Sequence, residues 1–106
     1  MKKLFVMHLN PGSESEYELR HNPIPAELAA AIRAHSVTSY SIFLDAERHL
    51  LYAYMEYESE EALGRLAERD VCQRWWRHMA PIMHVNADFS PVRDSTRQVF
   101  DLAAQT

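Results

Sequence analysis

Hydrophobic residues are concentrated in three stretches of this chain, and with the two-residue period of a β-strand they fall on both faces of each stretch. The stretches cover residues 3–9, 37–44 and 49–57. In the third stretch the period predicts two faces, one with Leu50, Tyr52, Tyr54 and Glu56 and the other with Leu51, Ala53, Met55 and Tyr57. Only a short polar segment separates the second stretch from the third, which predicts a hairpin. A last strand is expected at residues 98–102, after a segment over residues 84–95 whose turn-forming residues predict a loop.

Between the first two predicted strands the hydrophobic spacing becomes that of a helix. Ser13 and Glu16 form a capping-box pattern, so the helix is expected to begin there. It is expected to break at His21–Asn22, because Pro23 and Pro25 remove amide donors and disfavour helical geometry in the residues before them. Helical spacing resumes directly after the prolines.

Two more helices are expected after the third strand. Ser59 is the predicted cap of the first, and Asp70 is the predicted cap of the second, with Gln73 completing its capping box. The second helix carries an apolar stripe with i, i+3, i+4 and i+7 spacing, which ends before Pro81. Its members are Cys72, Trp75, Trp76 and Met79.

The predicted elements therefore follow the order β-α-β-β-α-β, which indicates an α+β fold of the ferredoxin-like type. Helices are expected on one face of an antiparallel sheet. Hydrophobic residues also occupy the other face of the strands, and leaving them in water would expose a large apolar patch. The pattern predicts a homodimer in which two sheets meet, with a pocket between the helix ends and the sheet. A length of 106 residues fits one domain over residues 1–106.

Composition narrows the classes of partner. Eleven Lys and Arg residues are scattered along a chain of net charge -4, so no basic stripe is available for nucleic acid. The hydrophobic fraction of 47% and charged fraction of 25% suggest neither disorder nor a membrane span. His8 interrupts the apolar start of the chain too early for a signal peptide, which predicts a cytoplasmic protein.

Three kinds of chemistry have little support in the sequence. Cys72 is the only cysteine, and its place in an apolar stripe favours a buried hydrophobe over a nucleophile. The six histidines show no spacing that is typical of a zinc site, so no metal is expected. With two glycines, a glycine-rich phosphate loop is not expected either.

Trp75 and Trp76 are the only tryptophans and stand side by side. Neighbours on a helix point about 100° apart, so one packed core buries one indole more easily than two. One interpretation places Trp75 in the core and Trp76 at a domain or subunit edge, and composition alone favours it. The other places an indole face on the floor of a pocket, stacked on a ring-shaped ligand.

Tyr17 and His21 are four residues apart, so on a helix they lie one turn apart on the same face. His21 also occupies the predicted helix break, where its side chain is expected to project. Histidine both takes and gives a proton near neutrality, since its ordinary pKa is about 6.5. His21 is therefore the candidate proton carrier, and the alternative is a solvent-exposed or capping histidine.

Aromatic and hydroxyl groups together suit a neutral sugar, which is held by stacking below and by hydrogen bonds around its rim. Tyr17, Trp75 and Trp76 fit that pattern. For Tyr52, Tyr54 and Tyr57, a place in the core or in a dimer interface is preferred.

Four segments, in the same order and spacing, resemble the L-rhamnose mutarotase family over almost the whole chain. They are Tyr17-x-x-x-His21-Asn22-Pro23-Ile24, Tyr40-Ser41-Ile42-Phe43-Leu44-Asp45, Asp70-Val71-Cys72-Gln73-Arg74-Trp75-Trp76 and Asn86-x-Asp88-x-Ser90-Pro91-Val92. One departure is visible. Where the family commonly carries a tryptophan and then a proline after His-Asn-Pro-Ile, this chain has Pro25-Ala26, which bears on substrate preference.

The resemblance implies a dimeric α/β-barrel enzyme without a cofactor, which interconverts the α and β pyranose anomers of L-rhamnose. His21 matches the family's proton donor, and Tyr17, Tyr40, Trp75 and Trp76 match its sugar-contacting positions. Ring opening needs one acid and one base. One hypothesis makes His21, as imidazolium, the acid for the ring oxygen, with a tyrosine or water carrying the other proton.

Fold alone leaves two other functions open, because the same architecture also includes small mono-oxygenases and ligand-binding modules. A mono-oxygenase would be marked by a bound chromophore or by turnover of an aromatic substrate. A binding module would hold sugar without accelerating anomer exchange. The Tyr17 and His21 pair, together with the Trp75-Trp76 block, favours the mutarotase.

Overall fold

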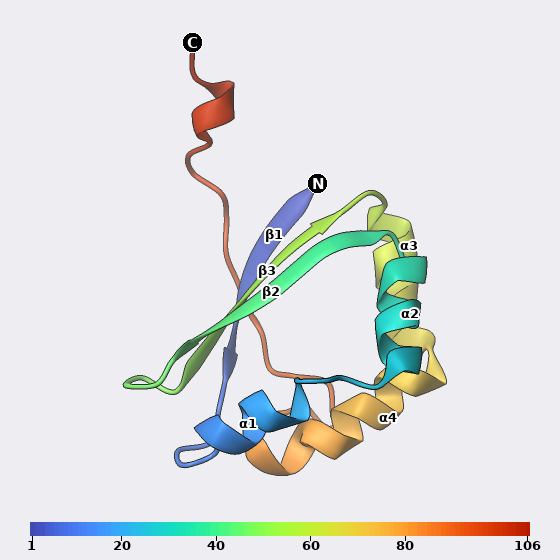
Figure 1. Ribbon diagram of the computed structural model, residues 1–106. Coiled ribbons are helices and arrows are strands. Elements are labelled where there is room, and N and C mark those ends of the chain that lie inside the picture. The colour runs from blue at the N-terminus through green and yellow to red at the C-terminus, as the bar shows by residue number, and fades with distance from the viewer.

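A four-stranded antiparallel sheet forms one layer of the computed structural model, which describes residues 1–106, and the helices form a second layer on one face of the sheet (Figure 1). The strand order is β2-β3-β1-β4. The strands are β1 (Lys2–His8), β2 (Val37–Asp45), β3 (Leu50–Tyr57) and β4 (Asp94–Ser95), and the helices are α1 (Glu14–Arg20), α2 (Ala26–Ala34), α3 (Glu60–Arg65) and α4 (Asp70–Met79). The predicted ferredoxin-like α+β fold is confirmed.

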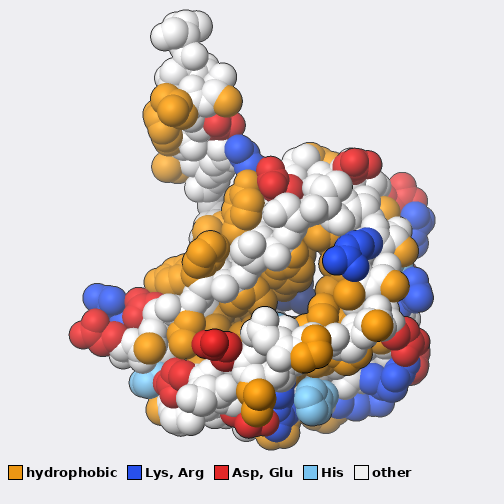
Figure 2. All heavy atoms as spheres, in the orientation of Figure 1, with side chains coloured by type: hydrophobic (Ala, Val, Ile, Leu, Met, Phe, Trp, Pro, Cys, Tyr) orange, Lys and Arg blue, Asp and Glu red, His pale blue; other side chains and the backbone are white.

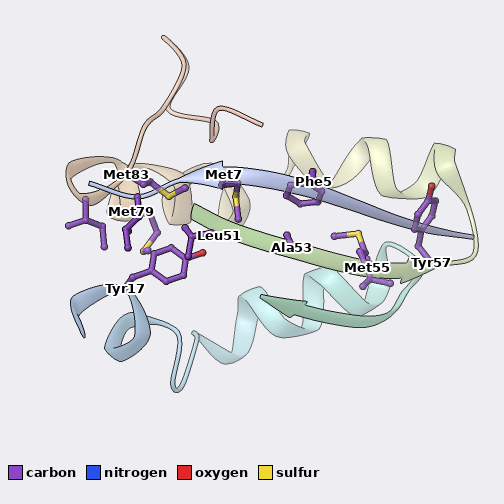
Figure 3. Packing of buried hydrophobic residues seen from close by; sticks show 12 residues of the cluster. Phe5, Met7, Tyr17, Leu51, Ala53, Met55, Tyr57, Met79 and Met83 are labelled. Carbon is purple, nitrogen blue, oxygen red and sulfur yellow. The ribbon is translucent and has the colours of Figure 1, made fainter. Parts of the chain in front are cut away.

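Strand β3 forms the centre of the core because its alternate residues face the helices. Leu51, Ala53 and Met55 are buried on that face. The helices contribute Tyr17 and Met79 to the same cluster, and Figure 3 shows Tyr17 reaching from α1 toward Leu51. The sequence pattern assigned these faces of β3 correctly, since a two-residue period leaves one face to the core and one to the outside.

A bulge in β2 decides which of its residues face the helices. The register shifts between Val37 and Ser39, after which Tyr40 lies opposite Met55. Residues paired directly across an antiparallel sheet share a face, so Tyr40 lies on the same face as the buried Met55. Without the extra residue, simple alternation from Val37 would put Tyr40 on the opposite face.

The helices lie where the spacing predicts them and Ser13 holds the predicted N-cap position of α1, but only one of the three predicted caps makes a side-chain capping bond. Ser59 caps α3 by accepting a hydrogen bond from the Ala62 amide at 3.1 Å. Ser13 precedes α1 but its side chain makes no capping bond. Asp70 is the first residue of α4 rather than its cap, because its carboxylate accepts from Arg74 at 2.7 Å.

The predicted strand at residues 98–102 is wrong. The chain pairs with β1 earlier, where Asp94 lies opposite Val6 and Ser95 opposite Phe5. A strand needs a neighbouring strand for its backbone hydrogen bonds, and residues 96–106 extend away from the sheet as a C-terminal arm (Figure 1). Val99 and Phe100 favour β-structure, but they have no neighbouring strand to pair with and therefore form no strand.

The outer face of the sheet, defined by Leu4, Val6, Phe43, Tyr52 and Tyr54, carries no helix. Phe43 is 62% exposed and Leu4 37% exposed, whereas the tyrosines are half-buried. The third tyrosine of β3, Tyr57, lies in the core, as one of the sequence interpretations expects. No helix of the chain has the length and apolar character required to cross a membrane.

Candidate functional site

A cavity of about 1200 Å³ lies between the helix layer and the sheet. Figure 2 shows the molecule hollowed between these layers, with hydrophobic side chains lining the hollow. All five residues that the sequence singled out line this cavity: Tyr17, His21, Tyr40, Trp75 and Trp76. The structure thus brings together residues that are 59 positions apart at the extremes, Tyr17 and Trp76.

His21 stands at the C-terminal end of α1, where the prolines stop the helix. Its ring stacks on Tyr17, with 4.2 Å between the ring centroids, and meets the edge of Trp75 at 5.1 Å. The Nδ1 nitrogen lies 2.9 Å from the main-chain carbonyl oxygen of Tyr17. Three contacts from two helices therefore fix the orientation of the imidazole.

The partner of Nδ1 determines the tautomer of His21. A carbonyl oxygen only accepts hydrogen bonds, so Nδ1 carries the proton and donates it. In the neutral ring Nε2 then carries a free lone pair, because no protein group donates a hydrogen bond to it. Burial lowers the pKa of His21 below its ordinary value of 6.5, which the bond to Tyr17 offsets only in part. The half-buried ring is thus neutral near pH 7, with a basic nitrogen available.

Tyr17 is buried, with 7% of its surface exposed, and contributes its ring to the core. Its hydroxyl has no hydrogen-bond partner in the protein and is not among the fully buried polar atoms, so it opens into the cavity. Burial raises the pKa of Tyr17 well above its ordinary value, and the nearby Tyr40 adds to the shift. This hydroxyl stays protonated and serves as a hydrogen-bond donor or acceptor rather than as a base.

Trp75 and Trp76 are both half-buried and both line the cavity. Trp75 also packs against the main core cluster and against the smaller cluster around Leu28, whereas Trp76 packs against neither. The structure therefore supports both sequence interpretations for Trp75, which is partly core and partly cavity wall. Trp76 lines the cavity without packing against either core cluster.

Tyr40 reaches the cavity from β2, at the edge of the sheet. The residue is 37% exposed as a whole, yet the dense surroundings of its hydroxyl raise the pKa of Tyr40 through burial. Arg93 opposes this shift and Cys72 adds to it. The Tyr40 hydroxyl is thus a protonated polar group within electrostatic reach of α4 and of the segment around β4.

Cys72 and Arg93 also line the cavity, although the sequence did not select them as site residues. Cys72 is buried, as expected, but it also lines the cavity wall. Arg93 lines the cavity from the strand β4 side. It lies in a segment that the sequence assigns to a loop, so only the pairing of β4 with β1 reveals where it points. No three His, Cys, Asp or Glu side chains are grouped so that they could hold a metal ion.

Comparison with known proteins gives the same family along the whole chain. A model of the L-rhamnose mutarotase family matches residues 2–102. An L-rhamnose mutarotase of Citrobacter koseri is 48% identical over 103 residues, which cover 97% of this chain and 99% of that protein. One from Pectobacterium atrosepticum is 49% identical over 102 residues, which cover 96% of this chain and 98% of that protein.

Solved structures agree on the fold. The crystal structure of an L-rhamnose mutarotase from Formosa agariphila is similar with a TM-score of 0.89 and 34% identity, covering 96% of this chain and 98% of that one. An antibiotic biosynthesis monooxygenase has a TM-score of 0.61 at 14% identity, covering 93% of this chain and 99% of that one, and shows the shared fold alone. The resemblance predicted from the sequence is confirmed: the chain belongs to the L-rhamnose mutarotase family.

Proposed function

We propose that the protein interconverts the α and β pyranose anomers of L-rhamnose in the cavity between α1, α4 and the sheet, with His21 as the proton carrier. The observation that carries this proposal is the fixed, neutral imidazole of His21 in a cavity walled by Tyr17, Trp75 and Trp76. General acid–base help by one such group typically raises a rate by about 10² to 10⁴.

The tautomer of His21 suggests that it first acts as a base, which revises the hypothesis that it starts as imidazolium. Nε2 takes the proton of the anomeric hydroxyl, the bond between C1 and the ring oxygen breaks, and the ring oxygen takes a proton from a hydroxyl or water. The open-chain aldehyde rotates about its C1–C2 bond. Reclosure on the other face reverses the transfers, and His21 returns its proton to the new anomeric oxygen.

The aromatic residues supply binding rather than proton transfer. Trp75 and Trp76 offer indole faces for the apolar side of the pyranose. Tyr17 and Tyr40 have raised pKa values, so their hydroxyls remain protonated and suit hydrogen bonds to the sugar hydroxyls. These four residues favour a neutral monosaccharide as substrate.

The departure from the family at Pro25 lies close to this binding wall. Pro25 is the N-cap of α2 and lines a second cavity of about 450 Å³ that also borders Trp75. An aromatic residue at this position, which the family commonly carries, would add a ring beside Trp75. Its replacement leaves that side of the indole open, and we expect a looser preference among related deoxyhexoses.

We also infer that the protein is a homodimer through the outer face of its sheet. Phe43 and Leu4 leave apolar surface exposed there, with Tyr52 and Tyr54 beside them. A contiguous apolar patch on a sheet face is typical of a protein–protein interface. A second copy of the same face would cover it and complete a barrel of two sheets.

Proton NMR saturation transfer between the α and β anomeric signals of L-rhamnose tests the proposed activity. Catalytic amounts of protein are expected to accelerate the exchange. An unchanged exchange rate, with folded protein shown by circular dichroism, would refute the activity. Binding of L-rhamnose without acceleration would favour the binding-module function instead.

A further inference from the structure

Arg93 lies on the helix side of the sheet although it belongs to no strand. Ser95 pairs with Phe5 and Asp94 with Val6, so alternation places the residue before Asp94 on the same face as Phe5. The contact agrees, since the guanidinium carbon of Arg93 lies 5.2 Å from the centre of the buried Phe5 ring. The side chain therefore extends over the floor of the cavity from its β4 edge.

The exposed guanidinium of Arg93 lies over the Phe5 ring but forms no ion pair or hydrogen bond with another protein group. Arg74 pairs with Asp70 at 2.7 Å and with Glu27 at 3.3 Å, whereas none of the ion pairs or side-chain hydrogen bonds of the chain involves Arg93. The carboxylate of Asp88 on the preceding loop accepts hydrogen bonds from Ser90, which lower its pKa most, and the charge of Arg93 lowers that pKa further without forming an ion pair. A guanidinium has five N–H donors in a planar fork, and here all five are free.

Arg93 also faces the other polar groups of the cavity from the opposite edge of the sheet. Tyr40 comes from β2, whereas Arg93 adjoins β4, and these strands are the two edges. The positive charge of Arg93 nevertheless lowers the pKa of Tyr40 against the effect of burial, and Tyr40 in turn raises the pKa of Tyr17. The polar groups thus form a series across the cavity, from His21 through the tyrosines to Arg93.

We propose that Arg93 is a further substrate-binding residue of this chain, which donates paired hydrogen bonds to two adjacent ring hydroxyls of the sugar that Trp75 and Trp76 hold. The inference rests on the proposed function, because it assumes a pyranose in the cavity with its reacting end at His21. A planar fork suits two acceptors that lie side by side. A charged donor that loses its acceptor discriminates strongly against the analogue lacking that hydroxyl.

The experiment compares Arg93→Gln with Arg97→Gln, since Arg97 is exposed on the C-terminal arm and does not line the cavity. Anomer exchange of L-rhamnose is measured by NMR, and affinity by titration of tryptophan fluorescence. Arg93→Gln is expected to lower kcat/KM by about 10- to 100-fold, mostly through KM, and to weaken the affinity similarly. Arg97→Gln is expected to match the wild type.

Monodeoxy analogues of L-rhamnose, each lacking one ring hydroxyl, separate hydrogen bonding from indirect effects. With either analogue that lacks one of the two partner hydroxyls, the loss caused by Arg93→Gln is expected to be smaller than with L-rhamnose, whereas an analogue that keeps both hydroxyls should show the full loss. Equal losses with every analogue, or no loss at all, would overturn the inference. If the wild type binds L-rhamnose but does not accelerate exchange, the proposed function fails, and the affinity comparison still decides the role of Arg93.

Discussion

The ring of His21 is held by Tyr17 in two ways at once: the tyrosine's main-chain carbonyl accepts from Nδ1 at 2.9 Å, and its side chain stacks on the imidazole at 4.2 Å. Both contacts come from the preceding helical turn. The pair therefore determines the tautomer of the ring, and together with the edge contact to Trp75 on α4 it fixes the ring's orientation. A group held this way needs little reorganisation when it transfers a proton.

Replacing His21 with alanine is expected to lower the catalysed exchange rate by about 10² to 10⁴ and to leave L-rhamnose binding measurable. NMR exchange at saturating sugar gives the rate, and tryptophan fluorescence gives the affinity. His84→Ala is the control, because His84 is exposed and does not line the cavity. Full activity in His21→Ala would identify His21 as a bystander.

Activity is expected to fall as the pH is lowered. The neutral form of His21 is the one that accepts the anomeric proton, and burial lowers the pKa of His21 below 6.5. The rate should therefore be level above pH 7 and decline with a midpoint below 6.5. A pH series of NMR exchange rates checks this, and a rate that rises toward acid would favour the imidazolium as the starting form.

The same shift in the pKa of His21 predicts the direction of a stability change. Because the folded pKa lies below the unfolded one, the unfolded chain binds the proton more readily between the two values. The free energy of unfolding contributed by this group should therefore decrease as pH falls from 6.5 toward the folded pKa. Urea unfolding at several pH values measures it, and His21→Ala should lack this component.

Removing only the hydroxyl of Tyr17 separates its two roles. Tyr17→Phe keeps the ring that stacks on His21, so the melting temperature should change little, while kcat/KM falls by roughly 10-fold through the lost hydrogen bond. Tyr17→Leu also removes the stacked ring and should lower activity further. Equal activity of wild type and Tyr17→Phe would remove the hydroxyl from the binding site.

The two tryptophans should differ in their effect on stability but agree in their effect on binding. Trp75→Ala is expected to cost about 2 to 4 kcal/mol of unfolding free energy, because Trp75 packs on both core clusters. Trp76→Ala should cost much less. Both should raise KM for L-rhamnose, and unchanged saturation curves in both variants would contradict stacking on the indoles.

A charge on the outer face of the sheet should separate the dimer. Phe43→Glu places a carboxylate where the apolar face would be buried, whereas Leu19→Glu alters an equally exposed residue on α1. Sedimentation equilibrium should give twice 12.3 kDa for the wild type and for Leu19→Glu, and 12.3 kDa for Phe43→Glu. A monomeric wild type would refute the proposed interface.

The sequence predicted the order of the elements and much of the site because those features depend on local patterns. Two-residue alternation identified the faces of β3, and the prolines after Asn22 located the helix break that carries His21. Tyr17 and His21 were paired through helical spacing alone. Their contact in the structure follows from the same geometry, since residues four apart lie on one face.

Features that depend on non-local pairing could not be predicted in this way. The last strand lies at Asp94–Ser95 rather than at residues 98–102, because the edge of β1 decides which part of the tail finds hydrogen-bond partners. The capping bonds predicted at Ser13 and Asp70 are also absent, although no distant residue is involved. Ser13 makes no capping bond, and the Asp70 side chain instead accepts from Arg74.

What the sequence by itself determined is therefore the fold and the family, together with the choice of residues proposed to bind a sugar, since periodicity and motif spacing are properties of the chain alone. Only the tertiary structure decided that Tyr40 faces the helices, through the bulge after Val37, and that Arg93 reaches the cavity floor, through the register of β4. A shift of one residue in a strand moves a side chain to the opposite face. That choice is made by the partner strand.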